Sequence, residues 1–228
     1  MTLLPVFSPS TAGGATIENT DDSFTTTSTL TPSFADQAMG TASADRIIVA
    51  TAAGYYTSLQ TLGSYSIAGE TGTERIASAS GGGNRPGMFS APVSSGTTGT
   101  MAPTWISQPA CYDTSIGIWA IKGSGANPTD TGSVFVAGGS STLLSVTVDV
   151  PAGGVVVAYT ICYNVAGTPN SFVGVDQDFV TATTGTDGQT FHAGGSKAYA
   201  ASQTDLDVTV ANTGTPQRSL IVAVWGPA

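Results

Sequence analysis

The sequence predicts an all-β protein, an antiparallel β-sandwich of jelly-roll-like type with an extended N-terminal arm. Two observations carry this prediction. Runs of alternating apolar and polar residues recur, and residues 144–150 are the clearest, because every second side chain there is aliphatic. Turn signals rich in Gly, Pro, Asn and Asp separate such runs, whereas no stretch longer than about two turns has a helical period.

An almost wholly apolar run follows this strand. Residues 155–163 read VVVAYTICY, which predicts a strand that is buried on both faces or central in a sheet. The intervening residues 151–154 are Pro-Ala-Gly-Gly, and they break the pattern because Pro cannot continue a ladder and Gly permits a tight reversal. We therefore predict a β-hairpin over residues 141–163 at the heart of the sandwich.

Residues 1–22 differ from the rest of the chain. They contain Pro5, Pro9 and the pair Gly13-Gly14, and they predict an extended arm, whereas residues 23–228 predict a single sandwich domain. Such an arm could wrap a neighbouring subunit. The candidate clamp consists of its apolar side chains, which are Leu3, Leu4, Val6 and Phe7.

Further strands are predicted from apolar or alternating runs, taken in chain order. They lie at 24–30, 47–52, 62–67, 75–80, 114–121, 132–136, 171–182, 205–210 and 219–225. Between residues 189 and 202 the alternation is imperfect around Gly194-Gly195, which predicts a bulge or a bend. The loop 81–87 has three successive glycines but lacks the Lys-Ser/Thr and the helix of a phosphate-binding loop, so it predicts a surface turn. No repeat is regular enough to indicate a solenoid.

The composition narrows the range of functions. Charged residues make up 9% of the chain against about 25% in a typical soluble domain, and Ser, Thr, Gly and Ala replace them. A surface built from hydroxyl groups suits an extracellular or virion setting better than a soluble cytosolic enzyme. The net charge is −9 and the six basic residues are scattered, so we expect no direct binding of nucleic acid.

The two cysteines, Cys111 and Cys162, allow at most one internal disulfide. Each lies near an apolar strand, so they are either two buried thiols or a bonded pair. A zinc site is not expected, because the chain has one histidine and no Cys-x-x-Cys. The N-terminus lacks the features of a secretion signal, and no run approaches the roughly 18 apolar residues of a membrane span, so we expect no membrane contact.

Four segments follow one another in a recognisable order. They are residues 34–50 with Ala44-Asp45-Arg46 before IIVA, residues 114–121, TSIGIWAI, residues 146–158 around Pro-Ala-Gly-Gly, and residues 220–225, LIVAVW. This order resembles that of accessory virion structural proteins of tailed bacteriophages. The resemblance implies a β-sandwich component of the virion, assembled in the host cytoplasm, on the head, tail or fibre. Its motifs are structural, so no functional residue is carried over.

Catalysis has little support in the sequence. His192 is the only histidine. As a catalytic base it would need a nucleophile and an oxyanion hole, and no Gly-x-Ser-x-Gly motif is present. An ordinary loop or sheet histidine is the favoured interpretation, and we predict neither enzymatic activity nor a cofactor.

Two acidic pairs stand out, Asp176 with Asp178 and Asp205 with Asp207. Their spacing would place both members of a pair on one face of a strand. Three interpretations are open: solvated or structural carboxylates, a calcium site completed by loop carbonyls, and the carboxyl pair of a glycosidase, which lies about 5–9.5 Å apart. The first is favoured, because no calcium-binding loop motif accompanies either pair, and all four residues remain weak calcium candidates.

Aromatic side chains could form a platform on which sugars stack. Tyr55 and Tyr56 point to opposite faces of a strand, so one of them is expected to be exposed, whereas Trp119 and Trp225 lie in apolar strands and are expected in the core. The full set of candidates is Trp105, Trp119, Trp225, Tyr55, Tyr56, Tyr65 and Tyr112.

These observations lead to one preferred function and one alternative. The preferred function is a non-enzymatic capsid decoration protein, which binds the major capsid protein or other virion proteins and stabilises the outer shell, as a homotrimer on a symmetry axis. The alternative is a tail, baseplate or fibre module that recognises a host-surface glycan. An acidic outer face would keep particles apart in solution and away from host DNA.

Overall fold

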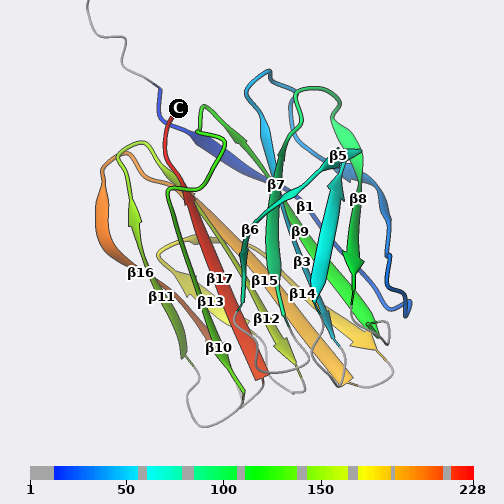
Figure 1. The fold of residues 1–228 in the computed structure, drawn as a ribbon. Helices are drawn as coiled ribbons and strands as arrows, with labels where there is room; N and C mark the ends of the chain where they lie inside the picture. Colours follow the sequence, from blue (N-terminus) through cyan, green and yellow to red (C-terminus); the bar gives the residue numbers. More distant parts are fainter. Residues whose placement is uncertain are drawn as a thin grey trace, which may run out of the picture.

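The computed structural model describes residues 13–55, 61–78, 85–106, 111–137, 143–163, 169–185, 188–212 and 217–228. Every regular element in these ranges is a β-strand, and all strand pairs are antiparallel, so the all-β prediction is confirmed (Figure 1). None of the described residues belongs to a helix that could cross a membrane.

Residues 16–122 form two sheets, and we call this part the N half. Its inner sheet has the order β1-β9-β3-β7-β6, with β1 at Thr16–Thr25, β9 at Asp113–Lys122, β3 at Ile47–Tyr55, β7 at Gly87–Pro92 and β6 at Thr73–Ala77. Its outer sheet has the order β2-β8-β4-β5, with β2 at Phe34–Ala38, β8 at Thr98–Trp105, β4 at Leu62–Ile67 and β5 at Glu70–Thr71.

Residues 130–225 form the other two sheets, and we call this part the C half. Its inner sheet has the order β10-β17-β12-β15-β14, with β10 at Asp130–Val136, β17 at Gln217–Trp225, β12 at Val155–Tyr163, β15 at Gly188–Ala198 and β14 at Asp176–Gly185. Its outer sheet has the order β11-β16-β13, with β11 at Leu143–Val150, β16 at Gln203–Asn212 and β13 at Pro169–Val173.

The four sheets stack in four layers with three apolar cores between them. One core joins the two sheets of the N half, a second joins the two sheets of the C half, and the third lies between the two inner sheets. We call this third contact the seam. Its fully buried side chains include Val49, Trp119, Tyr159 and Trp225. The inner sheets are therefore covered on both faces, and the outer sheets on one.

The two halves have the same topology. If β10, β11, β12 and β13 replace β1, β2, β3 and β4, and β14–β17 replace β6–β9, the strand order of the N half becomes that of the C half. In the C half the first strand pairs with the eighth, the second with the seventh and the third with the sixth. This pairing scheme is consistent with a jelly-roll winding of each half.

Irregularities in the ladders also coincide between the halves. The register of β6 against β7 shifts between Glu74 and Ile76, and the register of β14 against β15 shifts at the equivalent place, between Gln177 and Phe179. Arg75 and Asp178 are thus the extra residues of two equivalent β-bulges. A further shift occurs at equivalent positions of β4 and β13. The fold is therefore built from two copies of one sandwich unit.

The strands between Thr16 and Trp225 form two sandwich units that share the seam. One sequence prediction about strand pairing needs correction. The hairpin predicted over residues 141–163 does not form, because β11 pairs with β16 in the outer sheet while β12 pairs with β15 and β17 in the inner sheet. The turn at 151–154 carries the chain from one layer to the next.

The burial of these two strands has a simple cause. Side chains of β11 alternate between exposed and buried, because an outer sheet has one wet face. Residues 155–162 of β12 are all buried, since an inner sheet has none. Within the predicted arm, residues 16–22 form the first part of β1 at the edge of the inner sheet, and residues 1–12, with Leu3, Leu4, Val6 and Phe7, lie outside the described residues.

Candidate functional site

The seam carries the polar contacts that tie the halves together. The indole Nε1–H of Trp119 on β9 donates to Oδ2 of Asp178 on β14 at 2.7 Å. Thr181 Oγ1 on the same strand donates to Oδ2 of Asp22 on β1 at 2.8 Å. Burial raises the pKa of Asp178, and the hydrogen bonds from Trp119 and Ser196 oppose that rise. Asp178 therefore acts as an acceptor in the seam.

The equivalent bulge of the N half makes the equivalent kind of contact. Arg75 Nε donates to Ser90 Oγ at 2.7 Å, and its two terminal nitrogens reach Asn127 Oδ1 and the carbonyl of Ala126 at 2.5 and 3.1 Å. Asn127 and Ala126 lie in the segment that leads from β9 to β10. Asp178 thus contacts the N half and Arg75 contacts the segment that connects the halves, and the two bulge residues carry opposite charges.

A chain of buried polar groups crosses the seam beside these bulges. Ser115 Oγ on β9 lies 2.9 Å from the hydroxyl of Tyr159 on β12, and that hydroxyl lies 3.4 Å from Nδ1 of His192 on β15. Tyr159 and His192 have no exposed surface. Burial lowers the pKa of His192 to about 3, so the imidazole is neutral near pH 7. His192 is a sheet histidine, as expected, and no solvent reaches it.

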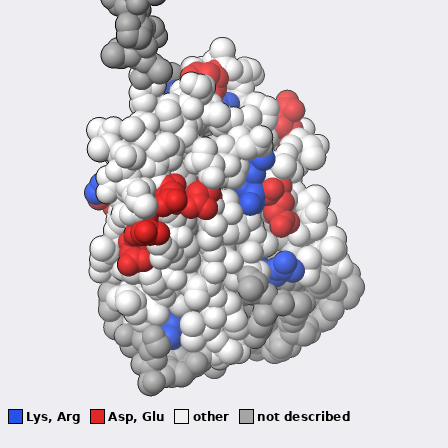
Figure 2. All heavy atoms as spheres, turned by 60° about the vertical axis from the view of Figure 1, so that its left-hand side comes forward, with Lys and Arg blue, Asp and Glu red and all other residues white. Residues whose placement is uncertain are grey.

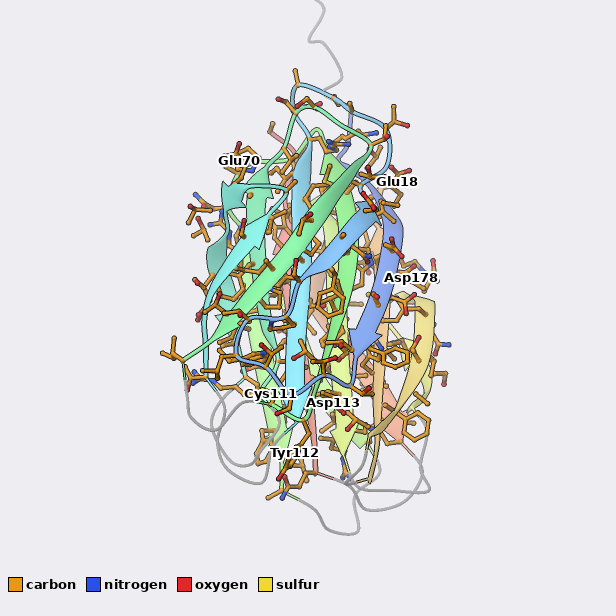
Figure 3. The ribbon with its side chains drawn as sticks, turned by 90° about the vertical axis from the view of Figure 1, so that its right-hand side faces the viewer. Glu18, Glu70, Cys111, Tyr112, Asp113 and Asp178 are labelled. Carbon is orange, nitrogen blue, oxygen red and sulfur yellow. The ribbon has the colours of Figure 1, made fainter. Side chains whose placement is uncertain are left out.

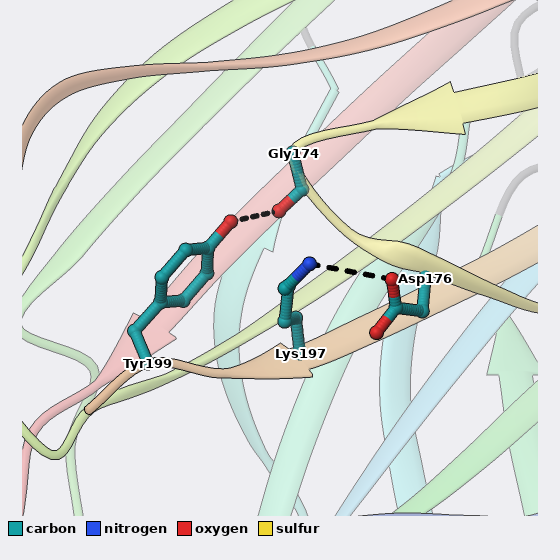
Figure 4. Close-up of polar contacts among 4 residues, drawn as sticks. All are labelled: Gly174, Asp176, Lys197 and Tyr199. Atoms are coloured by element: carbon teal, nitrogen blue, oxygen red, sulfur yellow. Dashed lines mark hydrogen bonds and ion pairs between the residues drawn. The ribbon is translucent and has the colours of Figure 1, made fainter. Parts of the chain in front are cut away.

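The first acidic pair lies at the β-bulge of β14. Asp176 accepts an ion pair from Lys197 Nζ at 3.4 Å, while Asp178, which is also exposed, accepts the Trp119 bond at the rim of the seam (Figures 3 and 4). Besides burial, the charge of Asp176 contributes to the raised pKa of Asp178, so the two carboxylates remain close to each other across the bulge. The bulge predicted around Gly194-Gly195 lies on β14, directly opposite those glycines.

The second acidic pair lies on the wet face of the outer sheet of the C half. Thr147 Oγ1 donates to Oδ1 of Asp207 at 2.7 Å, and the backbone N–H of Asp205 donates to Oδ1 of Asp149 at 2.9 Å. Asp149 in turn donates its backbone N–H to Oδ2 of Asp130 at 2.7 Å. In Figure 2, which brings the β11–β16 side forward, acidic side chains gather on one area of the surface.

These carboxylates belong to one of two candidate binding surfaces. The outer face of the C half carries acidic groups toward one end and exposed apolar side chains toward the other, where Val173 is 63% exposed. Its members are Leu143, Ser145, Thr147, Asp149, Ser171, Val173, Asp207, Thr209 and Ala211. The outer face of the N half is the equivalent surface, and on β4 and β8 it is composed of Ser64, Ser66, Thr98, Thr100, Ala102 and Thr104. Exposed acids lie on its edge strands, Asp36 on β2 and Glu70 on β5.

The aromatic candidates divide into buried and undescribed residues. Trp105, Trp119, Trp225 and Tyr65 are at most 1% exposed, so none of them offers a stacking surface. Tyr56 and the side chain of Tyr55 lie outside the described part of the chain. Tyr112 is half-buried at the end of the stack beside Cys111 and Asp113 (Figure 3).

One aromatic residue that the sequence analysis did not select is partly accessible. The hydroxyl of Tyr199 donates to the carbonyl of Gly174, and Lys197 Nζ lies 5.8 Å from the centre of its ring (Figure 4). The ring borders an open groove of about 510 Å³ lined by Gly14, Ala15, Ala152, Gly153, Ala198, Tyr199, Ala200 and Pro227. No periodic pattern marks Tyr199, because it follows the last residue of β15.

The Ala44-Asp45-Arg46 motif has a structural role. Arg46 is 1% exposed, and its guanidinium donates to five backbone carbonyls at 2.7–3.0 Å. These carbonyls belong to Met39, Gly40, Val93, Ser95 and Gly96, so one side chain holds two turns of the N half. Asp45 Oδ2 accepts from the backbone N–H of Gly123 at 2.8 Å, which fixes the end of β9.

Both cysteines are free and buried, so the disulfide alternative is wrong. Cys111 has no exposed surface, and Cys162 donates from Sγ to Oδ1 of Asn212 at 2.7 Å. Burial raises the pKa of both thiols, that of Cys162 to about 12. Neither sulfur is prepared to act as a nucleophile.

Among the described residues, no group of three or more His, Cys, Asp or Glu side chains is placed to hold a metal ion. Searches against protein-family models, curated proteins and solved structures find no match to this chain.

Proposed function

We propose that the chain is a non-enzymatic structural protein of a tailed-phage virion, a decoration protein that binds the outer shell of the capsid. The observation that carries the proposal is that the candidate site residues have structural roles. Asp178 and His192 lie in the seam, the described tryptophans are buried, and Arg46 binds backbone carbonyls. Wide outer sheet faces remain as the surfaces through which the protein can act.

The surface chemistry supports the same proposal. The chain has 9% charged residues, and strands β4 and β8 expose Ser, Thr and Ala on the outer face of the N half. A stack of β-sheets with hydroxyl groups and few lysines on its surface suits a position on the outside of a particle. The hydrogen-bonded sheets themselves offer a protease no long flexible segment. The partners would be the major capsid protein or other virion proteins, with the protein arranged as a homotrimer on a symmetry axis.

We assign the shell-binding surface to the outer face of the C half. Val173 there is 63% exposed, and the centre of a protein interface is enriched in apolar contacts while its rim is polar. The Ser and Thr side chains around it would form such a rim. The acidic end of the face would then set the orientation on the shell.

The test is binding to expanded capsids that lack the protein. The full chain is expected to bind them at saturable, regularly spaced sites visible by cryo-electron microscopy. Val173→Asp should weaken binding at least tenfold, whereas Thr100→Asp, on the equivalent outer face of the N half, should leave it unchanged. Absence of binding to the capsid, together with binding of the same protein to host-surface glycans, would reject decoration in favour of host recognition.

A further inference from the structure

His192 occupies a position in which the charged form of its imidazole is unfavourable. It has no exposed surface, and its ring lies 5.6–6.1 Å from the rings of Phe179 and Tyr159, measured between centroids. Its Nδ1 is 3.4 Å from the Tyr159 hydroxyl, and its Nε2 has no hydrogen-bond partner among the described residues. A buried imidazolium needs acceptors for two N–H groups, and this environment supplies a single weak one.

The groups around the ring do not compensate a positive charge. The strands that pack against β15 carry Tyr159 on β12, Asp178 on β14, Asp22 on β1 and Asp113 on β9. Their other titratable residues are Cys162, Tyr163, Asp176, Glu18, Asp21 and Lys122. Asp178 accepts from Trp119, and Asp22 accepts from Thr181, the residue opposite His192 on β14. Among the described residues, the recorded ion pair joins Lys197 and Asp176, and none involves His192.

His192 also lies at the seam rather than inside one half. Its neighbours along the hydrogen-bond chain are Tyr159 of the C half and Ser115 of the N half. The equivalent position in the N half, directly before β7, is Pro86, which cannot titrate. At this position, therefore, the C half contributes an imidazole and the N half a residue without a titratable group.

We propose that the seam is an acid-sensitive joint, in which charging of His192 separates β14 and β15 from β1 and β9. The charged ring would require water, and an opening between the inner sheets would admit it. The bonds of Asp178 to Trp119 and of Thr181 to Asp22 span this route and would break with it. The outer sheets, with their own cores, would remain folded.

The direction of the pH effect follows from linkage. Burial lowers the pKa of His192 to about 3, against 6.5 for an exposed histidine. The closed seam is therefore at full strength above pH 6.5, and it weakens as the pH falls from 6.5 toward 3, because the open form binds a proton that the closed form does not. The equilibrium constant for closure should fall by up to about tenfold per pH unit in this window.

The first measurement is the proton NMR titration of the intact protein, in which the single histidine gives an unambiguous imidazole signal. The signal is expected to stay at its neutral position from pH 8 to pH 5 in the native protein. A native-state titration centred near pH 6.5 would overturn the proposal. This measurement needs no variant.

The second measurement compares the wild type with His192→Gln, which cannot titrate. Hydrogen exchange of the Trp119 indole N–H should accelerate in the wild type between pH 6 and pH 4.5, after correction for intrinsic rates, by about tenfold per pH unit more than in the variant. Amides of β8 and β16, in the two outer sheets, should show no such difference. Parallel pH profiles of the two proteins, or simultaneous exchange of seam and outer-sheet amides, would overturn the proposal.

Discussion

Trp119 and Asp178 join the two halves of the molecule through one hydrogen bond, 2.7 Å between Nε1 and Oδ2. Their strands, β9 and β14, belong to different inner sheets, so the bond links one half directly to the other. The carboxylate is present at this place because of the β-bulge in β14. Its burial raises its pKa, which means that ionisation of Asp178 itself costs stability.

Replacement of Asp178 should separate these two effects. Asp178→Ala is expected to lower the free energy of unfolding by about 1–3 kcal/mol, because a buried indole N–H loses its acceptor. Asp178→Asn keeps an acceptor oxygen and removes a partly desolvated charge, so it should cost less than Asp178→Ala at pH 7. Urea unfolding followed by tryptophan fluorescence measures both. Equal losses in the two variants would contradict the role of the hydrogen bond.

Arg46 should be among the most sensitive residues of the N half. Arg46→Met leaves backbone carbonyls of two turns without their donor and should lower the free energy of unfolding by about 3 kcal/mol or more. Arg46→Lys should not restore it, because one ammonium group cannot reach five carbonyls. Thermal unfolding of both variants is the measurement. A stable Arg46→Lys protein would show that charge alone, and not the planar fork, holds these turns.

Gly194 should tolerate no side chain. A Cβ atom at this position would lie 2.4 Å from the ring of Phe179 and 2.6 Å from that of Trp119, so Gly194→Ala must displace two aromatic rings of the seam. We expect a loss of about 1–3 kcal/mol in the free energy of unfolding. Gly13→Ala is the matched control, because no atom lies within 4 Å of its added methyl group. A neutral Gly194→Ala would imply that the seam is looser than the structure describes.

The two thiols should not react with thiol reagents in the native protein. Burial covers Cys111 and Cys162 and raises the pKa of each, so neither forms a reactive thiolate at pH 8. Ellman's reagent should detect no fast thiol in buffer and two in urea. Mass spectrometry without reductant should find both cysteines unmodified. Immediate reaction of one thiol in the native protein would contradict the described packing of the cysteine that reacts.

The sequence was sufficient to predict most strands but not their partners, and the strand predicted at 24–30 is wrong because β1 covers Thr16–Thr25. Alternation in β11 and the apolar run in β12 are visible, because burial on one or two faces leaves a direct trace in the residues. The pairing is different, since Pro-Ala-Gly-Gly allows the chain to reverse within a sheet or to cross into the next layer. The hairpin prediction failed at this choice, which is decided by long-range packing.

The sequence did not reveal the duplication or the seam contacts, for a related reason. Equivalent positions keep the backbone geometry and not the residue: the two bulges carry Arg75 and Asp178. A single extra residue also interrupts the alternation of β14 at Asp178, and the spacing of Asp176 and Asp178 does not reveal it.

The strand pairing at the ends of each half has a consequence for how such a protein can gain or lose a sandwich unit. Thr16 on β1 pairs with Lys122 on β9, and Asp130 on β10 pairs with Val224 on β17, so the chain enters and leaves each half at neighbouring points. In Figure 1 the described start of the chain and its C-terminus accordingly lie at the same end. A sandwich with adjoining entry and exit behaves as a cassette: a copy can be inserted or removed through one short connection, and every internal strand pairing is left intact.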